Sequence, residues 1–142
     1  MLRKDHITLT VELGDRSAPI RCRAQQIQQI LMNLVTNARD AVNERHGFDE
    51  HDERKRIAIR VGHVEREGRS WVRVTVEDSG GGIPTDVLPR IFDPFFTTKG
   101  RDKGTGLGLA MSHGLASDNE GELSVETKVG EGTRFYLDLP AL

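Results

Sequence analysis

Two asparagines separated by one helical turn are the first residues whose type and spacing could do chemistry. Asn33 and Asn37 lie where apolar residues recur at spacings of three and four. Asparagine is a poor residue inside a helix, because its short amide competes for backbone hydrogen bonds. Its amide oxygen suits Mg²⁺, which takes one or two protein oxygens together with water and nucleotide phosphates. Asp40 and Glu44 continue the same side, so this side is either a metal-binding face or a solvated helix face.

A second cluster, residues 77–84, combines two acidic residues with three successive glycines. Asp78 could accept a hydrogen bond from an exocyclic amine, and the glycines would let a flat ring approach the backbone. A charge-assisted hydrogen bond of this kind contributes about 1.5–3 kcal/mol, enough to select adenine over a base with a carbonyl at that position. An aspartate followed by glycines also fits an ordinary tight turn.

Aromatic and basic residues make up a third cluster, residues 92–99, which holds three phenylalanines and ends at Lys99. Lys99, Arg101 and Lys103 could bring positive charge to a triphosphate when a loop closes. The alternative is that the rings pack under the loop and the charges are solvated.

The fourth cluster, residues 104–110, places alternating glycines directly before a predicted helix. The start of a helix offers free backbone N–H groups and the positive end of the helix dipole, which both suit phosphate. Alone this is a weak signal. The chain has no Gly-x-x-x-x-Gly-Lys-Ser/Thr motif, and the cluster does not follow a strand as a dinucleotide fingerprint would.

Hydrophobic periodicity predicts the elements that must position these clusters. A long amphipathic helix containing the two asparagines closes near Gly47, a short helical turn spans 86–90, and another helix spans 107–117. Alternating apolar and polar residues predict strands at 7–13, 56–64, 71–76, 122–127 and 133–139. Residues 94–106 lack periodicity and are predicted to form a mobile loop. This order favours a two-layer α/β sandwich with helices on one face of a mixed sheet.

Composition limits the classes of function. The 142 residues suit one domain, and a net charge of −2 from intermixed charges gives no basic field for nucleic acid. The single cysteine cannot form an internal disulfide, and the chain starts without the apolar stretch of a secretory signal. No apolar run approaches the roughly 20 residues of a spanning helix. We therefore expect a cytoplasmic domain without direct membrane contact, although a parent protein could be membrane-anchored.

In this order, the clusters resemble the histidine-kinase branch of the superfamily that also holds gyrase, MutL and the ninety-kilodalton heat-shock chaperone. Residues 29–38 resemble the N box of that family and 78–84 its first glycine box. Residues 92–99 resemble a variant F box ending in Pro-Phe-Phe-Thr-Thr-Lys, 104–110 the second glycine box, and 130–135 the closing strand. The resemblance implies the Bergerat-type ATP-binding fold, with a mostly antiparallel sheet, and an ATP lid at about 94–107.

The resemblance also implies roles for individual residues. Asn37 would coordinate Mg²⁺, with Asn33 near the phosphates and Lys99 reaching the outer ones; these three are the expected catalytic residues. Asp78 would hold the adenine amine, supported through water by Thr133. The other expected ATP-site residues are Asp40, Gly80, Gly82, Ile83, Phe92, Gly104, Thr105, Gly106, Leu107, Gly108 and Leu109.

The implied function is that of the ATP-binding catalytic domain of a two-component sensor histidine kinase. None of the five histidines has the sequence context of a phosphoacceptor. We therefore expect the γ-phosphoryl group to pass to a histidine on a separate dimerisation domain, and from there to a response regulator. The isolated domain should be monomeric and should not phosphorylate itself.

Two alternatives remain open at the level of sequence. Asn33 stands where ATPase relatives carry a catalytic glutamate, and an amide cannot act as a general base. An ATPase clamp or serine kinase would have to use Asp40 or Glu44 instead. The other alternative is a nucleotide-binding module without transfer activity. Two departures from the family pattern are Asp40, where many relatives carry lysine, and residues 117–121, which are expected to be a variable surface turn.

Overall fold

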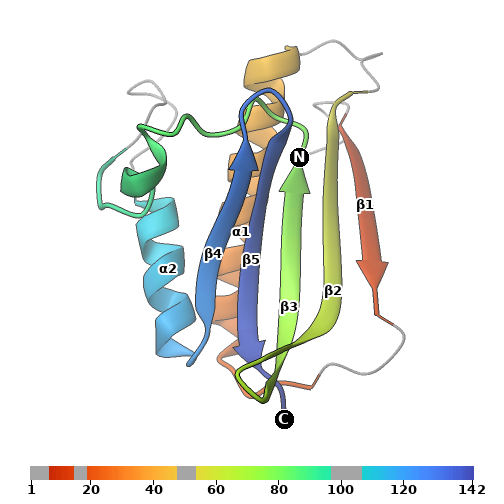
Figure 1. The fold of residues 1–142 in the computed structure, drawn as a ribbon, viewed down its shortest axis with the longest axis vertical. Helices are drawn as coiled ribbons and strands as arrows, with labels where there is room; N and C mark the ends of the chain where they lie inside the picture. Colours follow the sequence, from red (N-terminus) through yellow and green to blue (C-terminus); the bar gives the residue numbers. More distant parts are fainter. Residues whose placement is uncertain (1–6, 15–18, 48–53, 97–106) are drawn as a thin grey trace.

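The computed structural model describes residues 7–14, 19–47, 54–96 and 107–142, and within them the strands form one mixed sheet. The strands are β1 (Thr8–Leu13), β2 (Arg56–Arg66), β3 (Arg69–Asp78), β4 (Glu122–Lys128) and β5 (Gly132–Pro140). Their order across the sheet is β1-β2-β3-β5-β4 (Figure 1). β1 runs parallel to β2, whereas the other neighbours are antiparallel. The expected mixed, mostly antiparallel sheet is confirmed.

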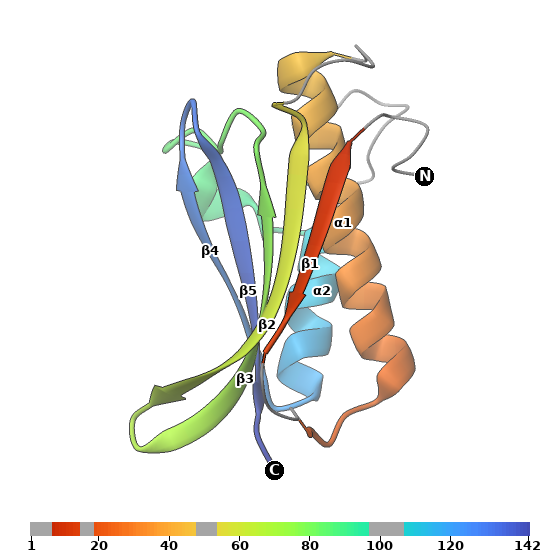
Figure 2. The same cartoon turned by 90° about the vertical axis from the view of Figure 1, so that its right-hand side faces the viewer.

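Two helices, α1 (Ala24–His46) and α2 (Gly108–Asp118), cover one face of this sheet (Figure 2). The apolar side of α1 is buried against it, with Ile30, Leu34 and Val42 fully inaccessible to solvent. Val76 and Leu137 meet that side from the middle strands. Each fully buried aliphatic side chain stabilises the fold by about 1.5–3 kcal/mol, so this layer holds the sandwich together. None of the helices in the described part of the chain is long and apolar enough to cross a membrane.

The hairpin between β2 and β3 is longer than the alternation predicts. Its turn is only two residues, Glu67 and Gly68, with φ values of 51° and 74°. Such a left-handed pair matches the twist of antiparallel strands, so the neighbouring charged residues continue the strands instead of forming a loop. Arg66 lies over the Trp71 ring at 4.5 Å and donates to Glu122 at 2.9 Å.

Charged side chains line the face of the sheet that the helices leave open. Arg73 makes a two-bond contact with the carboxylate of Asp138, at 2.8 and 3.0 Å. Glu77 accepts hydrogen bonds from Arg60 and Arg134 on the two neighbouring strands. The two guanidinium groups lower the pKa of Glu77 despite the opposing effect of its burial. Because successive side chains of a strand point to opposite faces, Glu77 and the next residue, Asp78, lie on opposite faces of the sheet.

The segment 117–121, expected to be a variable surface turn, is exposed at Ser117, Asp118 and Glu120, but its residue Asn119 ties the two helices together. Asn119 is only 7% exposed. Its side-chain oxygen accepts from the backbone N–H of Arg23 at 2.9 Å, and its amide nitrogen donates to Gln26 and to the carbonyl of Leu115, both at 2.8 Å. The end of α2 is therefore fastened to the start of α1. The short turn expected at 86–90 contains a 3-10 helix, Leu88–Arg90.

Candidate functional site

The candidate site is built on a row of side chains that crosses three strands at one end of the sheet. Asp78, the last residue of β3, pairs in register with Thr133 of β5, which pairs with Thr127 of β4. Registered residues of antiparallel strands share a face, so all three side chains lie on the side of the helices. Asp78 and Thr133 are 7% and 6% exposed. This row places polar side chains at one end of a layer that is largely apolar.

The carboxylate of Asp78 is held in an environment that disfavours its charge. Burial raises its pKa from 3.8 to about 6, even though the backbone N–H groups of Gly80 and Thr133 donate to it and oppose the rise. The Gly80 bond is 2.8 Å long, and the negative charge of Glu77 adds to the rise. A ligand that donates a hydrogen bond to this carboxylate would relieve part of the cost of burial.

The glycine turn after β3 packs closely against α1 and the β4–β5 turn. A Cβ atom at Gly80 would lie 2.7 Å from the Cβ of Ala41, and one at Gly82 would lie 2.5 Å from the carbonyl oxygen of Lys128. A side chain at either position would force these elements apart. The backbone N–H of Gly130 donates to the carbonyl of Gly81 at 2.9 Å, joining the two turns directly.

Thr127 connects the glycine turn after β3 to the β4–β5 hairpin and was missed by the sequence analysis. Its hydroxyl accepts from the backbone N–H of Ile83 at 2.9 Å, donates to the carbonyl of Gly132 at 3.1 Å, and lies 2.9 Å from the hydroxyl of Thr133. The available signal was the alternation of the last hairpin, which places Thr127 opposite Thr133 once the turn is known.

Arg45, in the last turn of α1, clamps the glycine turn and the β4–β5 turn together from outside and was also missed. Its guanidinium donates to the carbonyl oxygens of Gly80 at 3.1 Å, Ser79 at 3.3 Å and Gly130 at 2.7 Å. The Nε2 atom of His46 lies 2.9 Å from the carbonyl of Ser79. A helix end, the glycine turn and the β4–β5 turn therefore meet at one guanidinium.

Replacing Arg45 with alanine should lower the free energy of unfolding by about 1 kcal/mol, because charge-assisted bonds to three carbonyls are lost from a partly solvated site. Arg45→Lys should recover only part of this loss, since a single ammonium group cannot reproduce the planar guanidinium. Urea unfolding measures both. Arg90→Ala is the control, because the contacts of the Arg90 side chain with described residues are a 3.8 Å exposed ion pair with Asp93 and a ring contact with Phe96. Equal losses at positions 45 and 90 would contradict the clamp.

At the far end of the candidate site, Asn33 joins the two helices. Its amide nitrogen donates to the carbonyl of Gly108 at 3.2 Å and to the hydroxyl of Ser112 at 3.0 Å. Its oxygen accepts from Gln29 at 2.9 Å. The start of α2, with Leu107, Gly108 and Leu109, therefore lies beside the asparagine-bearing side of α1, and both ends of the Asn33 amide are engaged by protein groups.

The remaining predicted residues divide into those the structure places and those it does not describe. Asn37 is half-buried on α1, one turn after Asn33. Asp40 is half-buried and lies 3.4 Å from the guanidinium of Arg39. The Phe92 ring contacts that of His113, with centroids 4.8 Å apart. The predictions for Lys99, Gly104, Thr105 and Gly106 fall outside the described residues.

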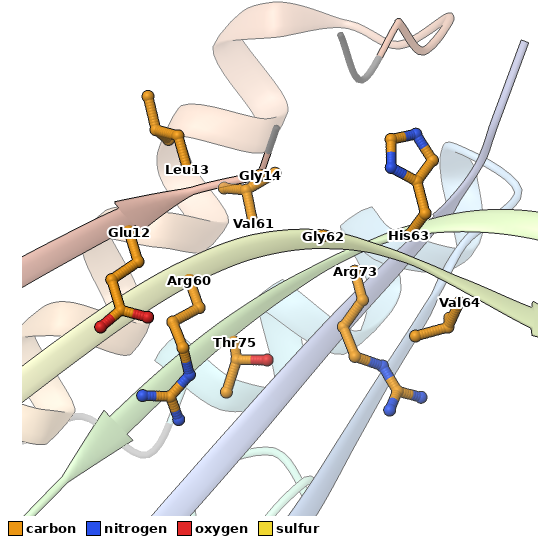
Figure 3. A pocket seen from close by; sticks show the side chains of 10 residues that line it. All are labelled: Glu12, Leu13, Gly14, Arg60, Val61, Gly62, His63, Val64, Arg73 and Thr75. Atoms are coloured by element: carbon orange, nitrogen blue, oxygen red, sulfur yellow. The ribbon is translucent and has the colours of Figure 1, made fainter. Parts of the chain in front are cut away.

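A shallow hollow of about 310 Å³ lies away from this row (Figure 3). It opens where β1 ends beside β2, around Gly62, and its lining includes Glu12, Arg60, Arg73 and Thr75. Arg60 and Arg73 are already neutralised by Glu77 and Asp138. Both arginines among the described lining residues are therefore paired with carboxylates and are poorly placed to recognise a phosphate, and the row ending at Asp78 is the better candidate.

In the described part of the chain, no group of three or more His, Cys, Asp or Glu side chains could hold a metal ion. The amide oxygen of Asn37 is a different kind of donor, which fits a Mg²⁺ ion that takes most of its ligands from phosphate and water.

Comparisons with known proteins agree with this arrangement. Residues 22–142 match the family model described as histidine kinase-, DNA gyrase B- and HSP90-like ATPase. The chain is 38% identical over 139 residues to the two-component sensor PprA of Pseudomonas aeruginosa and 39% identical over 140 residues to the sensor kinase CckA of Brucella abortus. These matches cover 98% and 96% of this chain, but the chain spans only 14% and 15% of the length of these relatives.

Solved structures show the same similarity. The catalytic domain of the histidine kinase ThkA, in a nucleotide-free form, superposes with a TM-score of 0.75 at 31% identity, covering 99% of this chain and 82% of that one. Full-length ShkA in complex with AMPPNP superposes with a TM-score of 0.73 at 25% identity, covering 98% of this chain and 26% of that one.

Proposed function

We propose that this chain transfers the γ-phosphoryl group of Mg²⁺-ATP to a histidine on a separate helical dimerisation domain. The proposal starts from its family: the chain belongs to the histidine kinase-, DNA gyrase B- and HSP90-like ATPase family, and it is an ATP-binding catalytic domain of the sensor histidine kinase type. A response regulator would then receive the phosphoryl group. The observation that carries the proposal is the buried carboxylate of Asp78, set between a glycine turn and Thr133.

Asp78 would recognise the base. Its buried carboxylate accepts hydrogen bonds from Gly80 and Thr133 and stays costly to ionise. The exocyclic amine of adenine would supply a further donor, and a charge-assisted bond in a desolvated site is stronger than one between neutral groups. The Gly80–Gly82 turn would lie along the ring, with Ile83 at the wall.

Asn37 would hold Mg²⁺ through its amide oxygen. When bound, the ion would neutralise charge on the β- and γ-phosphates. The backbone N–H groups of Leu107 and Gly108, at the start of α2, would face the phosphates with the positive end of the helix dipole. Lys99, Gly104, Thr105 and Gly106 remain predicted phosphate contacts from the sequence.

In the proposed reaction, an imidazole nitrogen of the partner domain attacks the γ-phosphorus. The bond between that phosphorus and the β–γ bridging oxygen breaks, and ADP leaves with the electron pair. Asn33 carries an amide and cannot take a proton from water, which disfavours hydrolysis. An imidazole is already nucleophilic, so positioning and charge neutralisation are sufficient contributions from this domain.

The decisive experiment combines this chain with the helical dimerisation hairpin of its own kinase and radiolabelled Mg²⁺-ATP. Acid-labile label should appear on the hairpin, whereas the chain alone should stay unlabelled. Asn37→Ala should reduce labelling at least about tenfold, because a ligand of the ion is lost. Gln28→Ala, an exposed amide on the same helix, is the control and should label normally.

Two outcomes would contradict the proposal. Rapid phosphate release without any acceptor would indicate an ATPase. Tight Mg²⁺-ATP binding with no label on the hairpin would indicate a nucleotide-binding module without transfer activity.

A further inference from the structure

Three hydrogen-bonding groups converge on the hydroxyl oxygen of Thr127, and together they determine where the hydroxyl protons lie. The backbone N–H of Ile83 is 2.9 Å from this oxygen and can only donate. The carbonyl oxygen of Gly132 is 3.1 Å away and can only accept. The hydroxyl of Thr133, at 2.9 Å, can do either. Each contact needs one proton, because two oxygens at this distance without a proton between them repel.

Counting protons leaves a single arrangement. Ile83 supplies the proton of its own contact, and the one proton of Thr127 must go to Gly132, which has none to give. The proton between the two hydroxyls therefore comes from Thr133. Thr127 then donates once and accepts twice, which uses its full hydrogen-bonding capacity.

The consequence appears at Thr133, beside the carboxylate of Asp78. Because its proton points towards Thr127, the hydroxyl oxygen of Thr133 presents only lone pairs on its other sides. Asp78, when ionised, is also an acceptor only. The side chains of this row therefore offer two acceptors and no donor to an arriving base, either directly or through a bridging water.

We propose that Thr127 is a positioning residue that sets the base specificity of the site, by directing the Thr133 proton away from the base. This inference rests on the proposed function. The 6-amino group of adenine has two N–H donors and matches two acceptors. A 6-oxo purine presents an acceptor at the same place and is rejected, because buried polar groups would be left unpaired.

Removing the Thr127 hydroxyl should loosen this selection. In Thr127→Val, which keeps the shape of the side chain, the Thr133 hydroxyl loses its fixed acceptor and can turn its proton towards a 6-oxo group. The comparison should use ATP and inosine triphosphate, which differ only at the 6-position and the adjoining N1. The ratio of their dissociation constants should fall about fivefold or more, the change expected for one hydrogen bond.

Calorimetric titration of both nucleotides in Mg²⁺ tests this on four proteins. Thr127→Ser keeps the hydroxyl and should retain the ratio of the unsubstituted chain. Thr75→Val makes the same chemical change at a buried threonine on the open face of the sheet and should also retain it. A general loss of stability would weaken both nucleotides equally and leave the ratio unchanged, so the ratio separates positioning from folding. If Thr127→Val does not fold, Thr127→Ala serves in its place.

The outcomes distinguish the inference from the function on which it rests. A reduced ratio in Thr127→Val together with normal ratios in the other two variants supports it. An unchanged ratio in Thr127→Val, or a ratio equally reduced in Thr127→Ser, overturns it while ATP binding by the unsubstituted chain still stands. If the unsubstituted chain binds neither nucleotide, the proposed function fails as well.

Discussion

The chain with Asp78 replaced by asparagine should bind Mg²⁺-ATP at least about tenfold more weakly than the unsubstituted chain, a loss of about 1.4 kcal/mol or more. The carboxylate is buried and sits where the adenine amine is expected to donate. Asparagine has almost the same shape, but it replaces one acceptor oxygen by an N–H₂ donor and removes the charge. Calorimetry at pH 8 measures the loss.

The same substitution should change the pH dependence of stability. The folded pKa of Asp78 is raised from 3.8 to about 6, so above pH 6 the folded chain carries a buried charge that costs more than it does in the unfolded chain. As pH falls through 6, the folded state takes up a proton first and this cost disappears. Relative to Asp78→Asn, the unsubstituted chain should therefore gain about 1 kcal/mol of unfolding free energy between pH 8 and pH 5. ATP affinity should fall over the same interval, because the protonated carboxyl is a poorer acceptor.

Glu77→Gln is the matched control for both measurements. Glu77 is adjacent in sequence but lies on the open face of the sheet, where it pairs with Arg60 and Arg134. Its pKa is lowered by those arginines, so its contribution to stability has the opposite sign: it is present at neutral pH and lost on acidification. ATP affinity should stay within about twofold of normal. Equal losses of ATP affinity at positions 77 and 78 would remove Asp78 from the base site. A difference in unfolding free energy between Asp78→Asn and the unsubstituted chain that does not change with pH would contradict the raised pKa of Asp78.

Periodicity predicts the layers of this fold because it reports which side of each element is buried. The alternation of the last hairpin and the spacing of three and four in the long helix agree with β4, β5 and α1. The charged residues on either side of the β2–β3 turn resemble loop residues in the sequence, so the alternation predicts shorter strands there than the structure has. Strand order is not a periodic property, and it became visible only in the structure.

The predicted site residues and the missed ones differ in how far away in the sequence their partners lie. Asp78 is followed closely by the three glycines of its turn, so this cluster can be recognised in the sequence. Arg45 acts on a carbonyl 85 positions away and Thr127 on an N–H group 44 positions away. Asn119 likewise fastens a residue 96 positions distant. Such contacts depend on which turns and helix ends meet in space, and the residues adjacent to each position in the sequence do not show that.

Gly132→Ala should have the largest effect on folding, with a loss of about 3 kcal/mol or more of unfolding free energy. Gly132 begins β5 with φ of 136°, a conformation that L side chains rarely adopt. A Cβ atom there would lie 2.1 Å from the carbonyl oxygen of Asp78 and 3.4 Å from the Cα of Ser79. Relief would need β5 to move away from the end of β3, which would separate Thr133 from Asp78.

Gly130→Ala in the same turn separates the two causes of that loss. Gly130 also has a left-handed φ, of 84°, but a Cβ atom there would meet nothing within 4 Å. Only the backbone penalty of about 1–2 kcal/mol applies. In urea unfolding, Gly132→Ala should therefore be clearly the less stable variant. In a nucleotide titration at a temperature where both are folded, it should also lose ATP affinity while Gly130→Ala keeps it. If the two variants lose the same stability, the close contact between Gly132 and Asp78 does not determine the stability of this end of the sheet. The pairing of Asp78 with Thr133, on which the proposed base site depends, would then be wrong.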